Sequence, residues 1–93
     1  MKKLLMTAAV AAVALGLGST ASLAEAYKAC WIYVGPVGDG GWSFQHDEGR
    51  KAVVAELGDK VETVFVENVA EPDSDRTIER LARDGCKMIF TTS

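Results

Sequence analysis

A glycine-rich segment, residues 33–49, concentrates the residue types that could bind a ligand. It reads YVGPVGDGGWSFQHDEG, so an apolar stretch runs into a glycine turn and then into a helical pattern. Glycines let backbone amides approach a bound group, and the first turn of a helix directs unpaired N–H groups and a positive dipole end toward it. Two aromatic rings, Trp42 and Phe44, lie in the same segment, although a turn does not need them. The segment therefore predicts a ligand site.

Trp42 is the best single candidate in this segment for contact with a ligand. Packing of its ring on the sheet is the competing interpretation, which composition alone favours. Its place at the start of a helix favours contact, because a ring at the mouth of a sheet can stack on a flat heterocycle, which contributes about 1–3 kcal/mol per base. Asp39 either caps the helix or accepts hydrogen bonds from ligand hydroxyls.

The glycine turn also invites comparison with the dinucleotide-binding pattern G-x-G-x-x-G. From Gly38 onward the chain reads GDGGWS, so Ser43 stands where the pattern has its third glycine. Glu67 is a candidate for the acidic residue that holds a ribose hydroxyl, but simple solvation explains it equally well. The pattern is incomplete, and we expect no cofactor.

His46 is the only histidine, and its surroundings indicate neither a metal site nor a catalytic site. Its acidic neighbours Asp47 and Glu48 do not share a helical face with it. Ser43 lies three residues before it, but nothing marks a third orienting group or oxyanion donors. We expect no catalytic residue and no metal ligand, and we expect His46 on an exposed helix surface.

The elements that must position these residues alternate between strand and helix. Runs of apolar and β-branched residues predict the strands, whereas capping residues and glycines bound the helices. The expected elements are a strand over 28–34, a helix over 42–57, a strand over 61–66, a helix from the N-cap candidates Asp73, Ser74 and Asp75 to Gly85, and a strand over 87–90. This β-α-β-α-β order predicts an α/β fold whose parallel sheet has the order 2-1-3 and binds ligands beyond the carboxyl ends of its strands.

Two packing features are expected from this arrangement. In the first helix, Val53 and Leu57 lie one turn apart, with Gly49 and Ala52 nearby to allow close packing. The chain stops at the carboxyl end of the third strand, so we expect a fragment of a larger domain, with an unpaired apolar edge.

Cys30 and Cys86 are expected near the amino ends of two neighbouring strands. In an oxidising compartment they can form a disulfide, and two buried free thiols are the alternative. The sequence leaves both open. Residues 27–29 read YKA, which is no lipobox, so lipid attachment through Cys30 is not expected.

Residues 1–26 have the features of a secretory signal peptide. A basic start precedes the apolar stretch 4–17 and a small-residue region that suits cleavage after Ala24 or Ala26. The apolar stretch is shorter than the about 20 residues that span a bilayer, so we expect export to the periplasm and no membrane insertion of the mature chain. The formal net charge of −3, without a basic patch, argues against nucleic-acid binding.

Several of these segments together resemble the start of the basic membrane protein (BMP) family of ABC-transporter substrate-binding proteins, in its purine-nucleoside-receptor-like group. The motifs are GPVGDGGWSFQHDEG in the turn, ENV after the second strand and FTTS at the third strand. The resemblance covers essentially all of residues 27–93. It implies a type I periplasmic-binding fold, of which 27–93 form part of the amino-terminal lobe, and delivery of a solute to a membrane permease.

The resemblance also implies a purine ligand. Family members bind purine nucleosides or related purines and stack an aromatic ring on the base. Carried over by position, the ligand-binding residues are Trp42, which would stack, Asp39, Gly41 and Ser43 around it, and Thr92 and Ser93 at the border of the cleft. The turn lacks the Asn-Asp-x-Ser-Phe-Asn pattern that supplies ribose contacts in better-known members, which favours a free nucleobase such as adenine.

The sequence therefore predicts the periplasmic solute-binding component of an ABC importer, without enzymatic activity. An exported α/β enzyme acting on nucleosides or nucleotides is the alternative, because Asp39, Glu67 and Asn68 follow predicted strands. A regulator similar to sugar-binding repressors is a third, which the signal peptide and the lack of a DNA-binding helix pair disfavour. We expect the chain alone to fold poorly and bind weakly, because half of the enclosing surface is missing.

Overall fold

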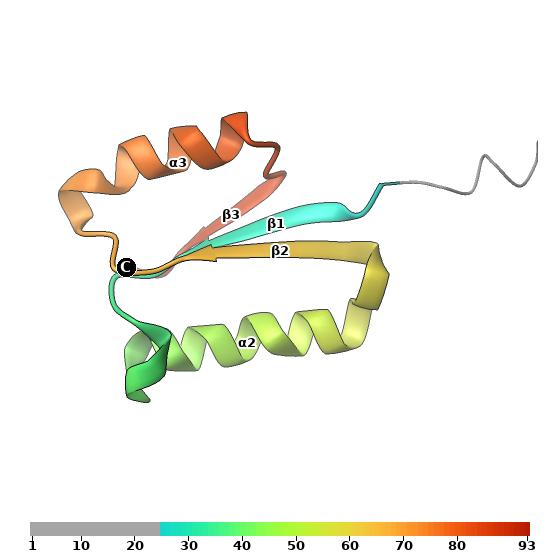
Figure 1. Cartoon of the computed structure of the whole chain (residues 1–93), viewed down its shortest axis with the longest axis horizontal. Helices are drawn as coiled ribbons and strands as arrows, with labels where there is room; N and C mark the ends of the chain where they lie inside the picture. Colours follow the sequence, from blue (N-terminus) through green and yellow to red (C-terminus); the bar gives the residue numbers. More distant parts are fainter. Residues whose placement is uncertain (1–24) are drawn as a thin grey trace, which may run out of the picture.

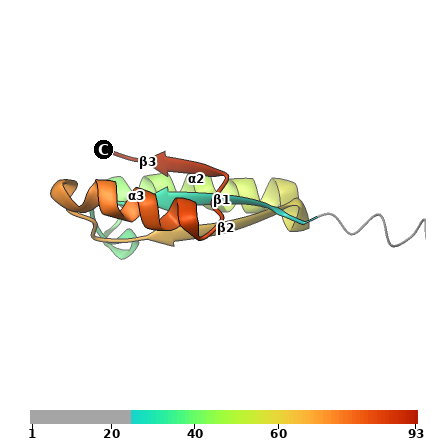
Figure 2. The ribbon, with the colours of Figure 1, turned by 90° about the horizontal axis from the view of Figure 1, so that it is seen from above.

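The computed structural model describes residues 25–93, which form a three-stranded parallel sheet with a helix on each face (Figure 1). The strands are β1 (Tyr27–Ile32), β2 (Val61–Val66) and β3 (Met88–Thr91). The helices are α2 (Trp42–Leu57) and α3 (Ser74–Arg83), and short 3₁₀ turns lie at η2 (Val37–Asp39), η3 (Gly58–Lys60) and η4 (Glu71–Asp73). The α/β class and the strand order 2-1-3 are confirmed, and Figure 2 shows β1 between β2 and β3.

The signal peptide predicted for residues 1–26 lies almost entirely outside the described part of the chain. Only Glu25 and Ala26 of that segment are described. Between residues 25 and 93, no helix combines the length and the apolar character needed to cross a bilayer.

β1 forms the centre of the core, as its apolar sequence predicts. Every residue from Ala29 to Tyr33 is buried, because α2 covers one face of the strand and α3 the other. Cys30 and Ile32 face α3, whereas Trp31 and Tyr33 face α2, following the alternation of side chains along a strand. The ladder ends at Ile32, two residues before the predicted end, because the chain bends after Tyr33 into the glycine turn.

Helix α2 begins and ends where predicted, but the predicted packing of its apolar residues is wrong. Its buried residues are Ser43 and Asp47, both polar. Leu57 is 44% exposed, and a Cβ added at Gly49 would meet nothing within 4 Å, so neither residue mediates close packing. The polar face turns inward because Tyr33 presents a hydroxyl group to it, as described below.

Helix α3 starts at Ser74, but its predicted side-chain N-cap is wrong. Asp73 occupies the N-cap position without a capping hydrogen bond and pairs instead with Arg76. The turn η4 precedes the helix directly, and Ser74 Oγ donates a 2.9 Å hydrogen bond back to the carbonyl of Glu71. The helix ends as predicted near Gly85, whose φ of 100° lets the chain turn back toward β3.

Cys30 and Cys86 form a disulfide in the structure, with their Cα atoms 6.0 Å apart. It joins β1 to the turn that leads into β3, where the amide of Lys87 also donates to the carbonyl of Lys28 at 2.8 Å. The parallel register, which pairs Cys30 with Ile89, brings the two cysteines together although 56 positions separate them in sequence.

Candidate functional site

The loops that follow β1 and β2 are tied to each other at the carboxyl edge of the sheet. The amide of Val69 donates to the carbonyl of Tyr33 at 3.0 Å, and the amide of Val37 donates to Glu67 Oε2 at 2.9 Å. Glu67, considered above for a ribose contact, thus holds the glycine turn in place. The turn is part of a connected structure at the edge where parallel sheets bind ligands.

The glycine turn itself is shaped by Asp39. Asp39 Oδ1 accepts a 2.9 Å hydrogen bond from the amide of Gly41, so Asp39 stabilises the turn and does not cap α2. Gly40 has a φ of 73°, a left-handed conformation that glycine adopts more readily than residues with a side chain. The Asp39 side chain is exposed. Gly41 occupies the N-cap position of α2, so the helix begins at the next residue, Trp42.

Trp42 presents its ring at the carboxyl edge in a fixed orientation. The side chain is 62% exposed, yet its Nε1–H donates a 2.8 Å hydrogen bond to the carbonyl of Thr92, beyond the end of β3. Its ring also packs against His46, with centroids 4.9 Å apart and planes at 59°. His46, expected on an exposed surface, is half-buried behind the indole. One ring is therefore anchored on two sides and remains largely open to solvent.

Two of the predicted ligand contacts have side chains that the fold uses internally. Ser43 is 3% exposed, and its Oγ accepts the amide hydrogen of Gly35 at 3.1 Å. Thr92 is also buried, and its Oγ1 donates to the carbonyl of Ile32 at 2.9 Å. Ser93, by contrast, is exposed next to Thr92. Trp42, Asp39 and Ser93 are thus the predicted site residues that present side chains to solvent, and Ser43 and Thr92 support them from below.

A buried polar network fixes α2 to the sheet below Trp42, and sequence reasoning missed it. Tyr33 donates its hydroxyl to Asp47 Oδ1 at 2.9 Å, and Arg50 Nε donates to the same oxygen at 2.6 Å. Arg50 Nη1 also donates to Thr63 Oγ1 at 2.9 Å, and its guanidinium lies 4.5 Å from the ring centroid of Phe65. The Asp–Arg pair at i, i+3 was visible in the sequence, but its burial was not, because it depends on Tyr33.

The network also shifts the ionisation of its members. Burial raises the pKa of the Asp47 carboxyl, but hydrogen bonds from Arg50 and Tyr33 outweigh burial and hold that pKa below its usual range. Burial, together with the adjacent Asp47 carboxylate, raises the pKa of the Tyr33 hydroxyl. At neutral pH the network therefore contains a charged Asp–Arg pair and a neutral tyrosine, which suits a structural role.

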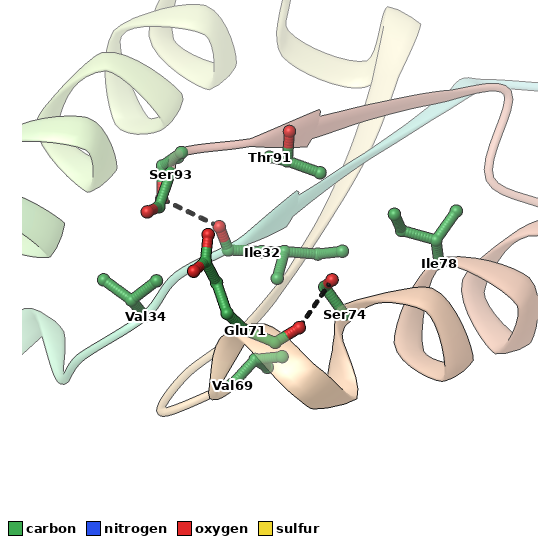
Figure 3. Close-up of a pocket in the computed structure, with 9 residues that line it drawn as sticks. Ile32, Val34, Val69, Glu71, Ser74, Ile78, Thr91 and Ser93 are labelled. Atoms are coloured by element: carbon green, nitrogen blue, oxygen red, sulfur yellow. Dashed lines mark hydrogen bonds between the residues drawn. The ribbon is translucent and has the colours of Figure 1, made fainter.

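A cavity of about 150 Å³ opens on the α3 side of the same edge (Figure 3). Its floor is apolar and consists of Ile32, Val34, Val69 and Ile78. Its polar lining consists of Glu71, Ser74, Thr91, Thr92 and Ser93. Thr92 therefore separates the cavity from Trp42: its carbonyl holds the indole, while the residue itself lines the cavity.

The side chains that the described residues bring together do not form a metal centre. Within residues 25–93, no group of three or more His, Cys, Asp or Glu side chains is placed to hold a metal ion. What the edge of the sheet offers is an anchored aromatic ring, backbone groups of a glycine turn and a small cavity with polar and apolar walls. Such an arrangement is suited to binding a small organic molecule.

Comparison with known proteins finds similarity over this stretch to two proteins whose names describe binding. No family model matches the chain. A purine-binding protein of Brucella abortus (strain 2308) is 58% identical over 78 residues, which cover 83% of this chain and 22% of that protein. A protein of Haloferax volcanii, named as the glucose-binding protein of an ABC transporter, is 41% identical over 76 residues, which cover 82% of this chain and 19% of that protein.

The chain thus spans about one fifth of the length of these curated relatives. Both names describe proteins that bind small molecules, and one of them describes a component of an ABC transporter. The similarity to ABC-transporter substrate-binding proteins that the sequence motifs predict is confirmed over this stretch.

Proposed function

We propose that residues 27–93 form the first part of the amino-terminal lobe of a periplasmic BMP-family protein that binds a purine and delivers it to the permease of an ABC importer. The observation that carries the proposal is the Trp42 ring, which is 62% exposed and anchored by Thr92 at the carboxyl edge of a parallel sheet. A large aromatic ring that stays exposed forgoes the stabilisation that burial of its apolar area would give. An exposed ring held in one orientation is therefore suited to a ligand that stacks on it.

A purine fits this ring by shape and by energy. A flat heterocycle stacked on an aromatic side chain gains about 1–3 kcal/mol, and a ring held by its Nε1–H loses little conformational freedom on binding. The purine-binding name of the Brucella relative, at 58% identity, supports the same ligand class. Adenine is the purine we favour, because the glycine turn lacks the pattern associated with ribose contacts.

The arrangement supports binding more than chemistry. Two polar side chains at this edge are engaged in the fold: Ser43, in the first turn of α2, with the amide of Gly35, and Glu67, in the loop after β2, with the amide of Val37. A catalytic group must be free to exchange protons or attack a substrate, so groups engaged in this way are poorly suited to catalysis. The names of the relatives point the same way, since both describe binding proteins.

A sugar is the second candidate ligand, and the name of the Haloferax relative favours it. Asp39 and Ser93 are exposed at the edge and suit hydroxyl groups, and the apolar face of a sugar ring can pack on Trp42. Purines and sugars therefore need to be compared directly in one experiment.

The test is a thermal-shift screen of the full-length protein that contains this chain. Adenine, guanine, adenosine, guanosine, inosine and glucose are compared, with Trp42→Ala and Trp42→Phe as variants. We expect a purine to raise the melting temperature of the wild type, and Trp42→Ala to abolish this rise. Trp42→Phe should retain most of it, because phenylalanine keeps an aromatic ring even though it loses the hydrogen bond to Thr92.

Tyr27→Ala is the matched control, because it removes an exposed aromatic ring from the opposite, amino-terminal end of β1. It should leave the ligand-induced shift unchanged. A shift with glucose and none with any purine would refute the purine assignment. A purine shift that survives Trp42→Ala in full would refute the role of Trp42.

A further inference from the structure

His46 packs against the exposed ring of Trp42, and the proposed purine site does not yet account for it. It follows Trp42 by one helical turn in α2, and the two ring centroids are 4.9 Å apart with their planes at 59°. His46 is half-buried, although an imidazole is costly to bury without hydrogen bonds. Among residues 25–93, no hydrogen bond or ion pair holds its nitrogens, so the ring contact with Trp42 is the interaction that this histidine makes there.

We propose that His46 is a positioning residue: its ring fixes the orientation of the Trp42 indole on which the ligand stacks, without touching the ligand. The inference rests on the proposed solute-binding function and adds to it the group that prepares the stacking surface. It applies to a free base, because it requires no other part of the ligand than the ring that lies on Trp42.

The hydrogen bond of Trp42 does not fix the indole alone. Trp42 Nε1 lies 2.8 Å from the carbonyl oxygen of Thr92, which restrains one distance, whereas the orientation of an indole depends on two side-chain torsion angles. Because Trp42 is 62% exposed, much of the ring has no neighbour that limits its tilt. A second contact from another direction is needed to define the plane, and His46 supplies it.

The backbone that carries His46 is held firmly against the sheet. Ser43 and Asp47, on either side of it in α2, are 3% and 2% exposed. Ser43 Oγ accepts a hydrogen bond from the amide of Gly35 at 3.1 Å. Asp47 Oδ1 accepts one from the Tyr33 hydroxyl at 2.9 Å. Since a helical side chain leans toward the preceding turn, the imidazole leans toward the indole from a backbone that is itself fixed.

A ring that is already oriented binds a flat ligand more tightly than a mobile ring, because less conformational freedom is lost when the complex forms. One tilted pair of aromatic side chains corresponds to about a 2- to 10-fold change in an equilibrium constant. Loss of the His46 ring should therefore weaken ligand binding by about this factor, whereas loss of the Trp42 ring should abolish it.

The first experiment is calorimetric titration of the full-length protein that contains this chain with adenine, using two variants that separate the ring of His46 from its polar atoms. His46→Phe keeps a ring and loses the hydrogen-bonding nitrogens, whereas His46→Gln keeps hydrogen-bonding groups and loses the ring. We expect His46→Gln to weaken adenine binding about 2- to 10-fold and His46→Phe to retain the wild-type affinity. Glu48→Gln is the matched control, because Glu48 is exposed in the same helix and does not share a helical face with Trp42.

Near-UV circular dichroism of the unliganded protein tests the orientation of the ring directly. The difference between the spectra of the wild type and Trp42→Phe is the signal of the Trp42 indole, whatever other tryptophans the full-length protein contains. The same difference should be smaller in the His46→Gln background, because an indole that samples several orientations averages its signal. In the His46→Phe background it should keep its wild-type size.

The two readouts separate the role of His46 from the purine function. Adenine affinity that is retained in His46→Gln and lost in His46→Phe would show that His46 hydrogen-bonds the ligand, and would overturn the positioning role. Equal effects of the two variants on the affinity, or a Trp42 signal that His46→Gln leaves unchanged, would also overturn it. Absence of purine binding by the wild type, together with a Trp42 signal that falls in His46→Gln, would refute the purine function and leave the support of the ring by His46 standing.

Discussion

Replacing Asp47 by asparagine should destabilise the protein strongly, although the two side chains have nearly the same shape. Asp47 is 2% exposed and accepts hydrogen bonds from Tyr33 and Arg50. The substitution removes the charge that compensates Arg50, whose side chain is only 14% exposed. Breaking a buried ion pair on one side costs about 3–5 kcal/mol, and the residual exposure of Arg50 places this case near 3 kcal/mol.

The same helix supplies the matched control. Glu48 and Lys51 have the same i, i+3 spacing as Asp47 and Arg50, but their side chains are 48% and 59% exposed. Solvent screens such a pair, so Glu48→Gln should change the free energy of unfolding by no more than about 0.5 kcal/mol. Urea unfolding of the full-length protein, monitored by tryptophan fluorescence, measures both variants.

The pH dependence provides a second readout of the same pair. The folded state holds the pKa of Asp47 below its unfolded value of about 3.9, so its ionised form stabilises the fold at pH values above that value. This stability is lost as pH falls through the lower, folded-state pKa. The gap between wild type and Asp47→Asn should therefore be constant near neutral pH and shrink in acid. Equal costs for Asp47→Asn and Glu48→Gln would refute the reasoning.

Three further predictions concern the backbone, the disulfide and the isolated chain. Gly40→Ala should destabilise the fold by about 1 kcal/mol, because Gly40 has a φ of 73°. Gly49→Ala, at a helical position with open space around it, should stabilise the fold by about 1 kcal/mol. Changes of the same sign in urea unfolding would contradict this. The double variant Cys30→Ala, Cys86→Ala should lose about 4 kcal/mol, the loop-closure value for a separation of 56, and a loss below about 1 kcal/mol would contradict it. The isolated chain 27–93 should aggregate because β2 and β3 leave large apolar side chains exposed, and a cooperative thermal transition would disprove that expectation.

Much of the fold could be predicted because local patterns carry it. Helix α2 runs over Trp42–Leu57 and β2 over Val61–Val66, the bounds that the sequence predicts, since both are set by neighbouring residues. The strand order 2-1-3 is the usual one for the first three strands of a doubly wound sheet, which the β-α-β-α-β pattern predicts. The glycine turn directly follows β1, so in a parallel sheet it lies at the carboxyl edge, and Trp42 could be located before its contacts were known.

Predictions that needed partners distant in sequence were less successful. The inward face of α2 was expected to be apolar, because Val53 and Leu57 have helical spacing, but the inward residues are Ser43 and Asp47. Helical spacing identifies which residues share a face, and it does not say which face meets the sheet. Tyr33 decides that question, since its hydroxyl needs an acceptor once the ring is buried.

By itself, the sequence determined the alternation of strands and helices, the parallel sheet and the position of an aromatic ring at the carboxyl edge of that sheet. Only the tertiary structure decided which polar groups remain available there: it engaged Ser43 and Thr92 in the fold, joined Cys30 to Cys86 and left the Glu71 carboxylate open at a cavity. The physical reason is the separation of the partners. Elements form from contacts within a few residues, whereas Trp42 meets Thr92 across 50 positions and Thr92 meets Ile32 across 60.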